Sequence, residues 1–181
     1  MAFNVNDIRS QLVLGGARSS LFQVDITNPV NGASNLKTPF MVRAAQIPSS
    51  SLGVIQVPYF GRKIKLAGDR TFDQWTVTVI NDEDFLIRNA LEEWSNAINA
   101  LQVNTSRALT PLAYKAQAIV TQFSKVGLPI RQYRFNGLFP SEISPIELDW
   151  NNTDAIEEFQ VTFQYDWWDV AGGTTGNAGG S

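Results

Sequence analysis

Apolar and polar residues alternate over most of this chain, in short segments bounded by turn residues. Apolar side chains at every second position predict half-buried β-strands. From the N-terminus, this pattern occurs over residues 21–27, 62–66, 72–80, 116–123, 130–136 and 159–167, and more weakly over 36–45 and 146–150. Residues 68–70, Gly-Asp-Arg, are expected to form a short hairpin connection between two of these strands.

One segment has helical spacing instead. The polar and acidic residues at 81–84 suit the start of a helix, where capping groups and negative charge are favourable. Apolar residues then recur every three or four positions, at Leu86, Ala90, Leu91, Trp94, Ile98 and Leu101. This pattern predicts an amphipathic helix over about 82–101, and a shorter helix is expected over 8–14. Together the elements predict a mainly β fold, an antiparallel β-sandwich or barrel with one flanking α-helix.

The length of 181 residues is that of one domain. No repeat or linker divides the chain, so we expect a single domain over residues 1–171. Residues 172–181 are rich in glycine and lack the apolar side chains that pay for ordering a backbone, so they predict a flexible C-terminal tail.

The composition excludes most catalytic chemistry. The chain has no cysteine and no histidine, which excludes disulfides, thiolate nucleophiles, cysteine-ligated metals and histidine-based triads. The carboxylates occur in turns and at a helix start, without a recognisable catalytic pair. We therefore predict that the protein is not an enzyme and has no metal or cofactor. No apolar run is long enough to cross a bilayer, so no membrane insertion by this chain is expected.

Charged residues make up only 17% of the chain, and the net charge is −3. A soluble domain usually has about 25% charged residues, so part of the surface is expected to be hidden in an assembly. The negative balance argues against a general nucleic-acid-binding surface.

Glutamine and threonine replace charged residues on the polar faces of several strands. These positions are Gln23, Thr27, Gln74, Thr76, Thr78, Gln160, Thr162 and Gln164. Such residues can simply face solvent on strands that favour them. The alternative is a surface that meets a partner or a passing ligand without holding it by fixed charges.

Residues 46–60 form an unusually apolar segment for a connection. Serines at 49–51 and Gly53 make a flexible lead-in, and Pro58 is expected to interrupt strand pairing. The apolar bulk comes from Val54, Ile55, Val57, Tyr59 and Phe60. Exposed apolar patches usually mark interaction sites, so these residues are expected to form an interface. The alternative is an ordinary core strand over 54–57.

One run of mixed polar and aromatic residues is too specific to follow from strand periodicity. Residues 61–83, GRKIKLAGDRTFDQWTVTVINDE, resemble the tail tube proteins of T-even-type contractile phages. Further similar segments follow the same order as in that family: 21–26, 114–115, 118–120, 137–140, 147–150 and 159–162. The resemblance covers roughly residues 20–169.

The resemblance implies a structural protein of the virion, assembled in the host bacterial cytoplasm. It implies six subunits in a ring whose sheets join around a channel, and rings that stack into a tube through which DNA passes without specific binding. The implied partners are other copies of the chain, the tail sheath protein, the tape-measure protein, and the baseplate and tail-terminator proteins. Within this picture, residues 46–60 reach the neighbouring ring. Gln74, Thr76, Thr78, Gln160, Thr162 and Gln164 are expected to line the channel.

Two alternatives remain at this stage. The chain resembles, by function, the tubes of pyocin-like particles and of type VI secretion systems, which sequence separates poorly from phage tails. A free ligand-binding β-sandwich with exposed tryptophans is the second alternative.

Overall fold

The computed structural model describes residues 5–12, 15–103, 105–106, 110–151 and 153–178. Its strands are β1 (Phe22–Ile26), β2 (Val42–Ala45), β3 (Ser50–Tyr59), β4 (Arg62–Phe72), β5 (Trp75–Ile80), β6 (Ala116–Phe123), β7 (Pro129–Ile143), β8 (Glu158–Gln164) and β9 (Trp167–Gly172). Its helices are α1 (Val5–Gln11), α2 (Thr38–Met41), α3 (Leu86–Ile98) and α4 (Pro111–Tyr114), with a 3-10 turn, η2, at Gly32–Ser34. The mainly β fold expected from the sequence is confirmed.

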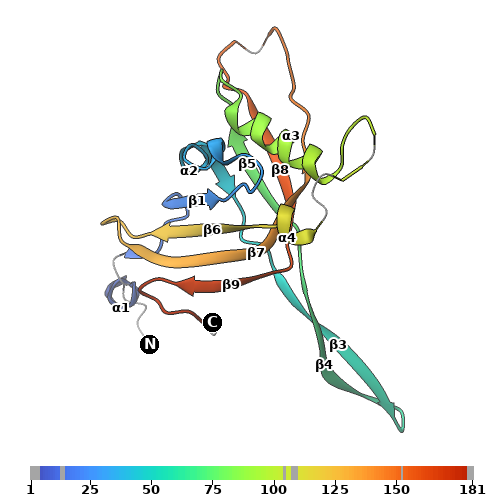
Figure 1. The fold of residues 1–181 in the computed structure, drawn as a ribbon. Helices are drawn as coiled ribbons and strands as arrows, with labels where there is room; N and C mark the ends of the chain where they lie inside the picture. The colour runs from blue at the N-terminus through green and yellow to red at the C-terminus, as the bar shows by residue number, and fades with distance from the viewer. Residues whose placement is uncertain (1–4, 13–14, 104, 107–109, 152, 179–181) are drawn as a thin grey trace.

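All strand pairs are antiparallel, and β7 belongs to two parts of the same sheet. The strands follow the order β1-β6-β7-β8-β5-β2, with β9 also paired to β7. The first part of β7 pairs with β6 and β9, and residues 139–143 pair with β8. The β6, β7 and β9 strands cross β5 and β8 at a steep angle (Figure 1), so the two parts of the sheet enclose a core between them.

Aromatic and β-branched residues from both parts of the sheet fill this core. Trp75 is fully buried and its ring stacks on that of Phe135, with centroids 4.4 Å apart. Phe163 lies beside Trp75 at 5.6 Å. The core side chains of β5 and β8 are those of the odd-numbered residues, as the alternation predicts.

Helix α3 covers one side of the core with the apolar stripe predicted for it. Its buried residues are Ile87, Ala90, Leu91 and Trp94, and Trp94 donates a hydrogen bond to the carbonyl oxygen of Tyr114 at 2.8 Å. The helix is shorter than the predicted 82–101. It begins at Leu86, whose backbone N–H is bound by the Asp84 carboxylate, and it ends at Ile98, so Leu101 is left 91% exposed.

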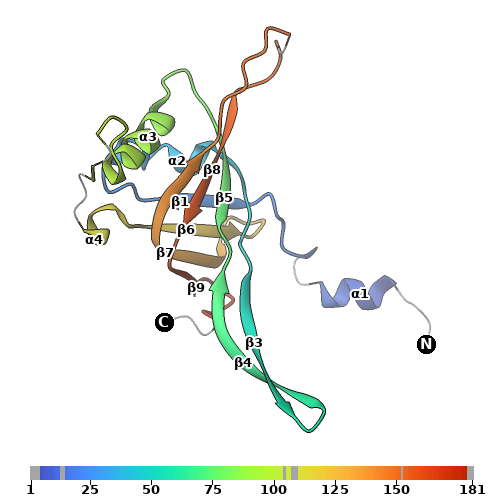
Figure 2. The same cartoon turned by 90° about the vertical axis from the view of Figure 1, so that its right-hand side faces the viewer.

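The hairpin of β3 and β4 stands outside the body of the molecule. It projects away from the core at one end, while the segment between β7 and β8 projects at the opposite end (Figures 1 and 2). Strands of this length span roughly 33 Å. A compact chain of this size has a radius of gyration of about 16 Å, so the hairpin is long enough to reach well beyond its own subunit.

Four local expectations are wrong. Residues 68–70 do not turn the chain but lie within β4, where the ladder is irregular between Leu52 and Val54. Gly53 and Gly68 face each other there so closely that a Cβ on Gly68 would lie 3.1 Å from the Gly53 carbonyl carbon. Residues 36–45 contain α2 before the short strand β2, because Pro39 suits a first helical turn. Residues 146–150 form no strand, and the alternation over 159–167 is broken at residues 165–166 between β8 and β9.

The chain termini lie away from the helix-covered side. All of α1 is exposed, and it stands apart from the sheets in Figure 2. After β9 the chain returns along the start of β7, where the Thr175 hydroxyl donates to the carbonyl oxygen of Ile130 at 2.9 Å. The single-domain boundary at residue 171 and the flexibility of residues 172–181 stay predictions.

Candidate functional site

The β3–β4 hairpin has one apolar face that the described part of its own subunit leaves exposed. Directly opposed residues share a face of an antiparallel pair. Ile55 therefore lies beside Leu66, and Val57 beside Ile64. All four are more than 40% exposed. These four residues, together with Tyr59, are called the apolar hairpin face below.

The opposite face of the hairpin is polar and basic near its tip. Gln56 is paired with Lys65, and Pro58 with Lys63. Arg62 is paired with Tyr59 beside the turn and therefore lies on the apolar side. None of these three cations forms an ion pair in the part of the chain that the structure describes. The hairpin thus carries most of its apolar area on one side and the charges of Lys63 and Lys65 on the other.

The turn at the hairpin tip presents an aromatic side chain in an unfavourable backbone conformation. Phe60 and Gly61 connect Tyr59 to Arg62, and both have positive φ, 40° and 83°. A two-residue turn of this kind usually has Asn-Gly, because positive φ is costly for a bulky residue. Phe60 is nevertheless 91% exposed, and its ring lies edge-on to that of Tyr59. A costly conformation that exposes an aromatic ring points to a role in binding.

The base of the hairpin is fixed to the body. The Tyr165 hydroxyl donates to the backbone carbonyl of Asp73, and the Ser49 hydroxyl bonds the Asp73 carboxylate across the two strands. Phe72 packs against the rings of Tyr165 and Trp168, with centroids 6.1 and 6.4 Å away. Burial raises the pKa of Tyr165 to about 12, and the Asp73 charge adds to this effect. These contacts fix the direction in which the hairpin leaves the domain.

The structure therefore corrects the expected form of residues 46–60. They are not a loop with interrupted pairing, since residues 50–59 form β3 and Pro58 occupies a position in its ladder with β4. The ladder has two strands, so Pro58 interrupts no pairing on its outer side. A core strand over 54–57 is also wrong, because Val54, Ile55 and Val57 are exposed. Val54 is paired with Ala67 and lies on the other face of the hairpin from Ile55 and Val57. The sequence reasoning missed Ile64 and Leu66 as members of the surface, although their alternation was visible.

The glutamine and threonine residues predicted to line a channel lie together on the outer face of β5 and β8. Thr76 is opposite Thr162, with hydroxyl oxygens 3.5 Å apart, and Thr78 is opposite Gln160. Gln164 ends the same face of β8, and the exposed Gln74 directly precedes β5. An ion pair between Arg43 and Glu158 lies at one end of this face. The surface is therefore polar and nearly neutral, which is compatible with the expected role but does not test it.

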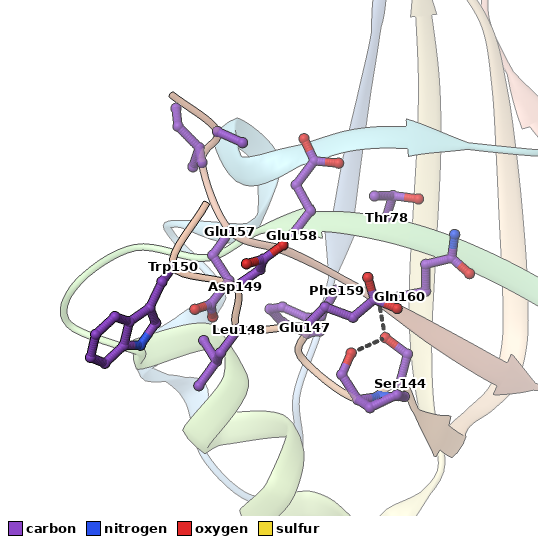
Figure 3. Close-up of a pocket in the computed structure, with 13 residues that line it drawn as sticks. Thr78, Ser144, Glu147, Leu148, Asp149, Trp150, Glu157, Glu158, Phe159 and Gln160 are labelled. Atoms are coloured by element: carbon purple, nitrogen blue, oxygen red, sulfur yellow. Dashed lines mark hydrogen bonds between the residues drawn. The ribbon is translucent and has the colours of Figure 1, made fainter. Parts of the chain in front are cut away.

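A cleft of about 740 Å³ lies at the end of the molecule opposite the hairpin. It is formed by β5, β8 and the β7–β8 connection, and Figure 3 shows the Trp150 indole turned away from the other lining side chains. Its lining includes the carboxylates Glu147, Asp149, Glu157 and Glu158, and the apolar residues Leu148, Trp150, Ile156 and Phe159. Trp150 is 99% exposed. The sequence pattern indicates solvated turns for these acids and does not reveal a cleft.

A second charged cluster has a structural role. Lys37 reaches the carboxylates of Asp82 and Asp84 just before α3, with 2.7 Å between its Nζ and Asp82 Oδ2. Hydrogen bonds from Lys37 lower the pKa of both aspartates and raise the pKa of Lys37.

Among the described residues, no group of three or more acidic side chains is arranged to hold a metal ion. No described helix is long and apolar enough to cross a bilayer.

Comparison with known proteins decides the family. The family model described as phage tail tube protein matches residues 17–171. The chain belongs to the phage tail tube protein family. The tail tube protein gp19 of Enterobacteria phage T4 is 36% identical over 154 residues, covering 84% of this chain and 91% of that protein. A tail tube protein of Serratia phage KSP90 is 26% identical over 166 residues, covering 89% and 93% of the two chains.

Solved structures of contractile injection systems share the fold of this tail tube protein. A chain of the sheath–tube complex of the extracellular contractile injection system PVC has a TM-score of 0.63 at 13% identity, covering 92% of this chain and 97% of that one. A chain of the tube-terminating cap of the anti-feeding prophage has the same TM-score at 17% identity, with 85% and 89% covered.

Family membership confirms three expectations from the sequence. The protein is a structural component of the virion, it belongs to the tail tube, and it is not an enzyme. Family membership thereby excludes the alternative function of a free ligand-binding β-sandwich.

Proposed function

We propose that this tail tube protein forms hexameric rings that stack into the inner tube of a contractile phage tail, the conduit for DNA ejection. The observation that carries the proposal is the β3–β4 hairpin. It projects from the body and keeps an apolar face in solvent, and a hydrogen bond from Tyr165 to Asp73 holds its base to the body. An isolated two-stranded hairpin is marginal in water, so a covering partner explains why such a face exists.

The hairpin is the contact between successive rings in this proposal. The sequence predicts Val54, Ile55, Val57, Tyr59 and Phe60 for that contact. Ile64 and Leu66 add to the face of Ile55, Val57 and Tyr59, while Val54 lies on the other face. Covering several half-exposed aliphatic side chains stabilises an interface at about 25 cal/mol per Å² of apolar area. Repetition around a ring multiplies the effect, because every subunit contributes one hairpin.

Open sheet edges support assembly within a ring. β2 is paired only with β5, and residues 139–143 of β7 are paired only with β8. These edges lie on either side of the β5–β8 face that carries the glutamines and threonines. Joining the two edges between neighbours would extend this face around a closed channel without leaving unpaired backbone groups.

A channel of this composition suits DNA that must move. Binding to the DNA backbone grows with the number of cationic contacts to phosphates. Thr76, Thr78, Gln160, Thr162 and Gln164, with Gln74 beside them, offer hydrogen bonds but no charge. The proposed channel therefore lets DNA pass without holding it.

The proposed partners follow from the relatives. The PVC structure is a sheath–tube complex, and other similar structures are of a baseplate and of a tube-terminating cap. We propose that the outer surface of the tube meets a sheath protein and its two ends meet a baseplate and a terminator. A tape-measure protein inside the tube completes the assembly. The 36% identity to a phage protein favours a phage tail over a pyocin-like or type VI-like particle.

Replacing the hairpin tests this proposal. Ser51 and Thr71 are cross-strand neighbours at the hairpin base, so a short Gly-Ser turn can join them in place of residues 52–70. Purified wild-type protein should form rings and tubes in negative-stain micrographs, and sedimentation should give a ring near 120 kDa, six times 20.0 kDa. The shortened protein should keep its circular dichroism spectrum and form no tubes. Tubes formed by the shortened, folded protein would overturn the proposal.

A further inference from the structure

We infer that the cleft between β5, β8 and the β7–β8 connection is the receptor for the β3–β4 hairpin of the next copy of this chain. The inference rests on the proposed stacking of rings and names the surface that the hairpin meets. The cleft shares Thr78 and Gln160 with the proposed channel face, so the docked hairpin covers that end of the face. The contact is head-to-tail: the hairpin of one subunit enters the cleft of another, whose own hairpin enters a third.

The two surfaces lie at opposite ends of the molecule. In both views of the ribbon, the hairpin and the β7–β8 connection point in opposite directions from the body. A contact between two different surfaces repeats without limit when its operation does not close on itself. Opposite placement along one axis is the arrangement that builds a stack.

Their charges are complementary. The hairpin carries Arg62, Lys63 and Lys65, which form no ion pair among the described residues. The cleft is lined by four carboxylates and, within the described chain, by no lysine or arginine. Glu158 is already paired with Arg43, and Glu157 accepts a hydrogen bond from the Asn81 side-chain amide. Glu147 and Asp149 have no cationic partner in the described structure, so they can receive one from a neighbour.

Their apolar surfaces are complementary as well. The β7–β8 connection exposes Leu148, Trp150 and Ile156 by 84%, 99% and 71%. A hairpin in a cleft contacts walls with both of its faces. The apolar hairpin face then meets these side chains, while the lysine face meets the carboxylates. The volume of about 740 Å³ is within the range of sites that enclose compact ligands, roughly 300–1,000 Å³.

Crosslinking gives a direct test, because the chain contains no cysteine. The double variant Lys63→Cys with Glu147→Cys places one thiol on the hairpin and one in the cleft. Oxidised tubes of this variant should give a ladder of covalent multimers on a non-reducing gel, since each chain links to the next. Each single variant can give at most a dimer. The matched control, Lys63→Cys with Lys125→Cys, places the second thiol on the exposed turn before β7 and should give no ladder.

Charge exchange provides an independent test in case the cysteines disturb assembly. Reversing the hairpin charges (Lys63→Glu, Lys65→Glu) should raise the protein concentration needed for tubes about tenfold or more, and so should reversing the cleft charges (Glu147→Lys, Asp149→Lys). An equimolar mixture of the two variants should also restore tubes, because alternating rings place each reversed hairpin in a reversed cleft and each wild-type hairpin in a wild-type cleft. The variant that carries all four substitutions should form tubes at a protein concentration within about threefold of that needed by the wild type.

The outcomes separate this inference from the proposed function. If wild-type protein forms tubes, the hairpin replacement abolishes them, and yet neither the ladder nor the charge rescue is seen, the hairpin docks elsewhere and only the inference is wrong. A ladder of equal strength in the Lys125 control also overturns it. If wild-type protein forms no tubes, the proposed function itself fails.

Discussion

β4 and β5 are consecutive strands with the same alternating pattern, but the apolar side chains of β5 are buried and those of β4 are exposed. Only Asp73 and Gln74 separate them. In β5, the apolar residues Trp75, Val77 and Val79 are at most 2% exposed, whereas Ile64 and Leu66 of β4 are each 52% exposed. The difference lies in what covers each strand. The rest of the sheet and α3 enclose the apolar side of β5, while β4 has β3 as its partner and, in the described structure, no second layer. Alternation therefore specifies a strand with an apolar face, but not whether that face is covered by the same chain or by another.

Truncating the core side of this comparison should have the largest effect. Trp75→Ala removes a fully buried ring that stacks on Phe135. A buried Trp→Ala change costs about 3–5 kcal/mol of unfolding free energy, a large part of the roughly 5–15 kcal/mol that stabilises a domain. Urea denaturation of the variant under non-assembling conditions measures this loss. A loss below about 1 kcal/mol would contradict the described core.

Polar substitutions on the hairpin should separate assembly from folding. Changing Ile55, Val57, Ile64 and Leu66 to threonine keeps strand propensity and removes most of the apolar face. Because these side chains are exposed in the subunit, the free energy of unfolding should change by less than about 0.5 kcal/mol per site. Tubes should be lost in negative-stain micrographs while the monomer melts as the wild type does. A variant that melts far earlier would mean that the face is covered within its own subunit.

The hairpin tip offers a finer test of the same contrast. Phe60→Asn gives the turn the Asn-Gly sequence that positive φ at both positions favours. The change should leave the melting temperature equal or slightly higher, and it should weaken tube formation because the exposed ring is lost. Thermal melting and the concentration dependence of light scattering measure the two effects. Phe60→Tyr, which keeps a ring, is the control and should polymerise normally; unchanged polymerisation of the Asn variant would remove Phe60 from the interface.

The smallest effect is expected at the junction of body and hairpin. Burial raises the pKa of Tyr165 from its ordinary 10 to about 12. A folded-state pKa above the unfolded one adds stability that is fully present below pH 10 and is lost as the pH rises toward 12. Tyr165→Phe should remove this dependence and the late-titrating tyrosine in an absorbance titration. Tyr59→Phe, on the exposed tip, is the control. A late titration that persists in the Tyr165 variant would contradict the anchoring described here.

The residue patterns were sufficient to predict the domain core but not the β3–β4 hairpin. The odd-numbered residues of β5 and β8 and the apolar stripe on α3 are buried as periodicity predicts, because one chain supplies both sides of that core. The turn at residues 60–61 is hard to predict because Phe60 occupies the position where Asn is usual. Gly68 indicates a turn by its residue type, but in the structure it allows the backbones of β3 and β4 to approach closely at Gly53. The cleft could not be predicted, since its acids come from both ends of the β7–β8 connection and only folding brings them beside β5.

The central claim is that the apolar hairpin face is an intersubunit surface. A cryo-electron microscopy map of tubes assembled from the wild-type protein tests this most directly, at a resolution that shows side chains. Ile55, Val57, Ile64 and Leu66 should each be buried against a subunit of the adjacent ring. A map in which these side chains remain in solvent, or fold back onto their own subunit, would contradict the claim.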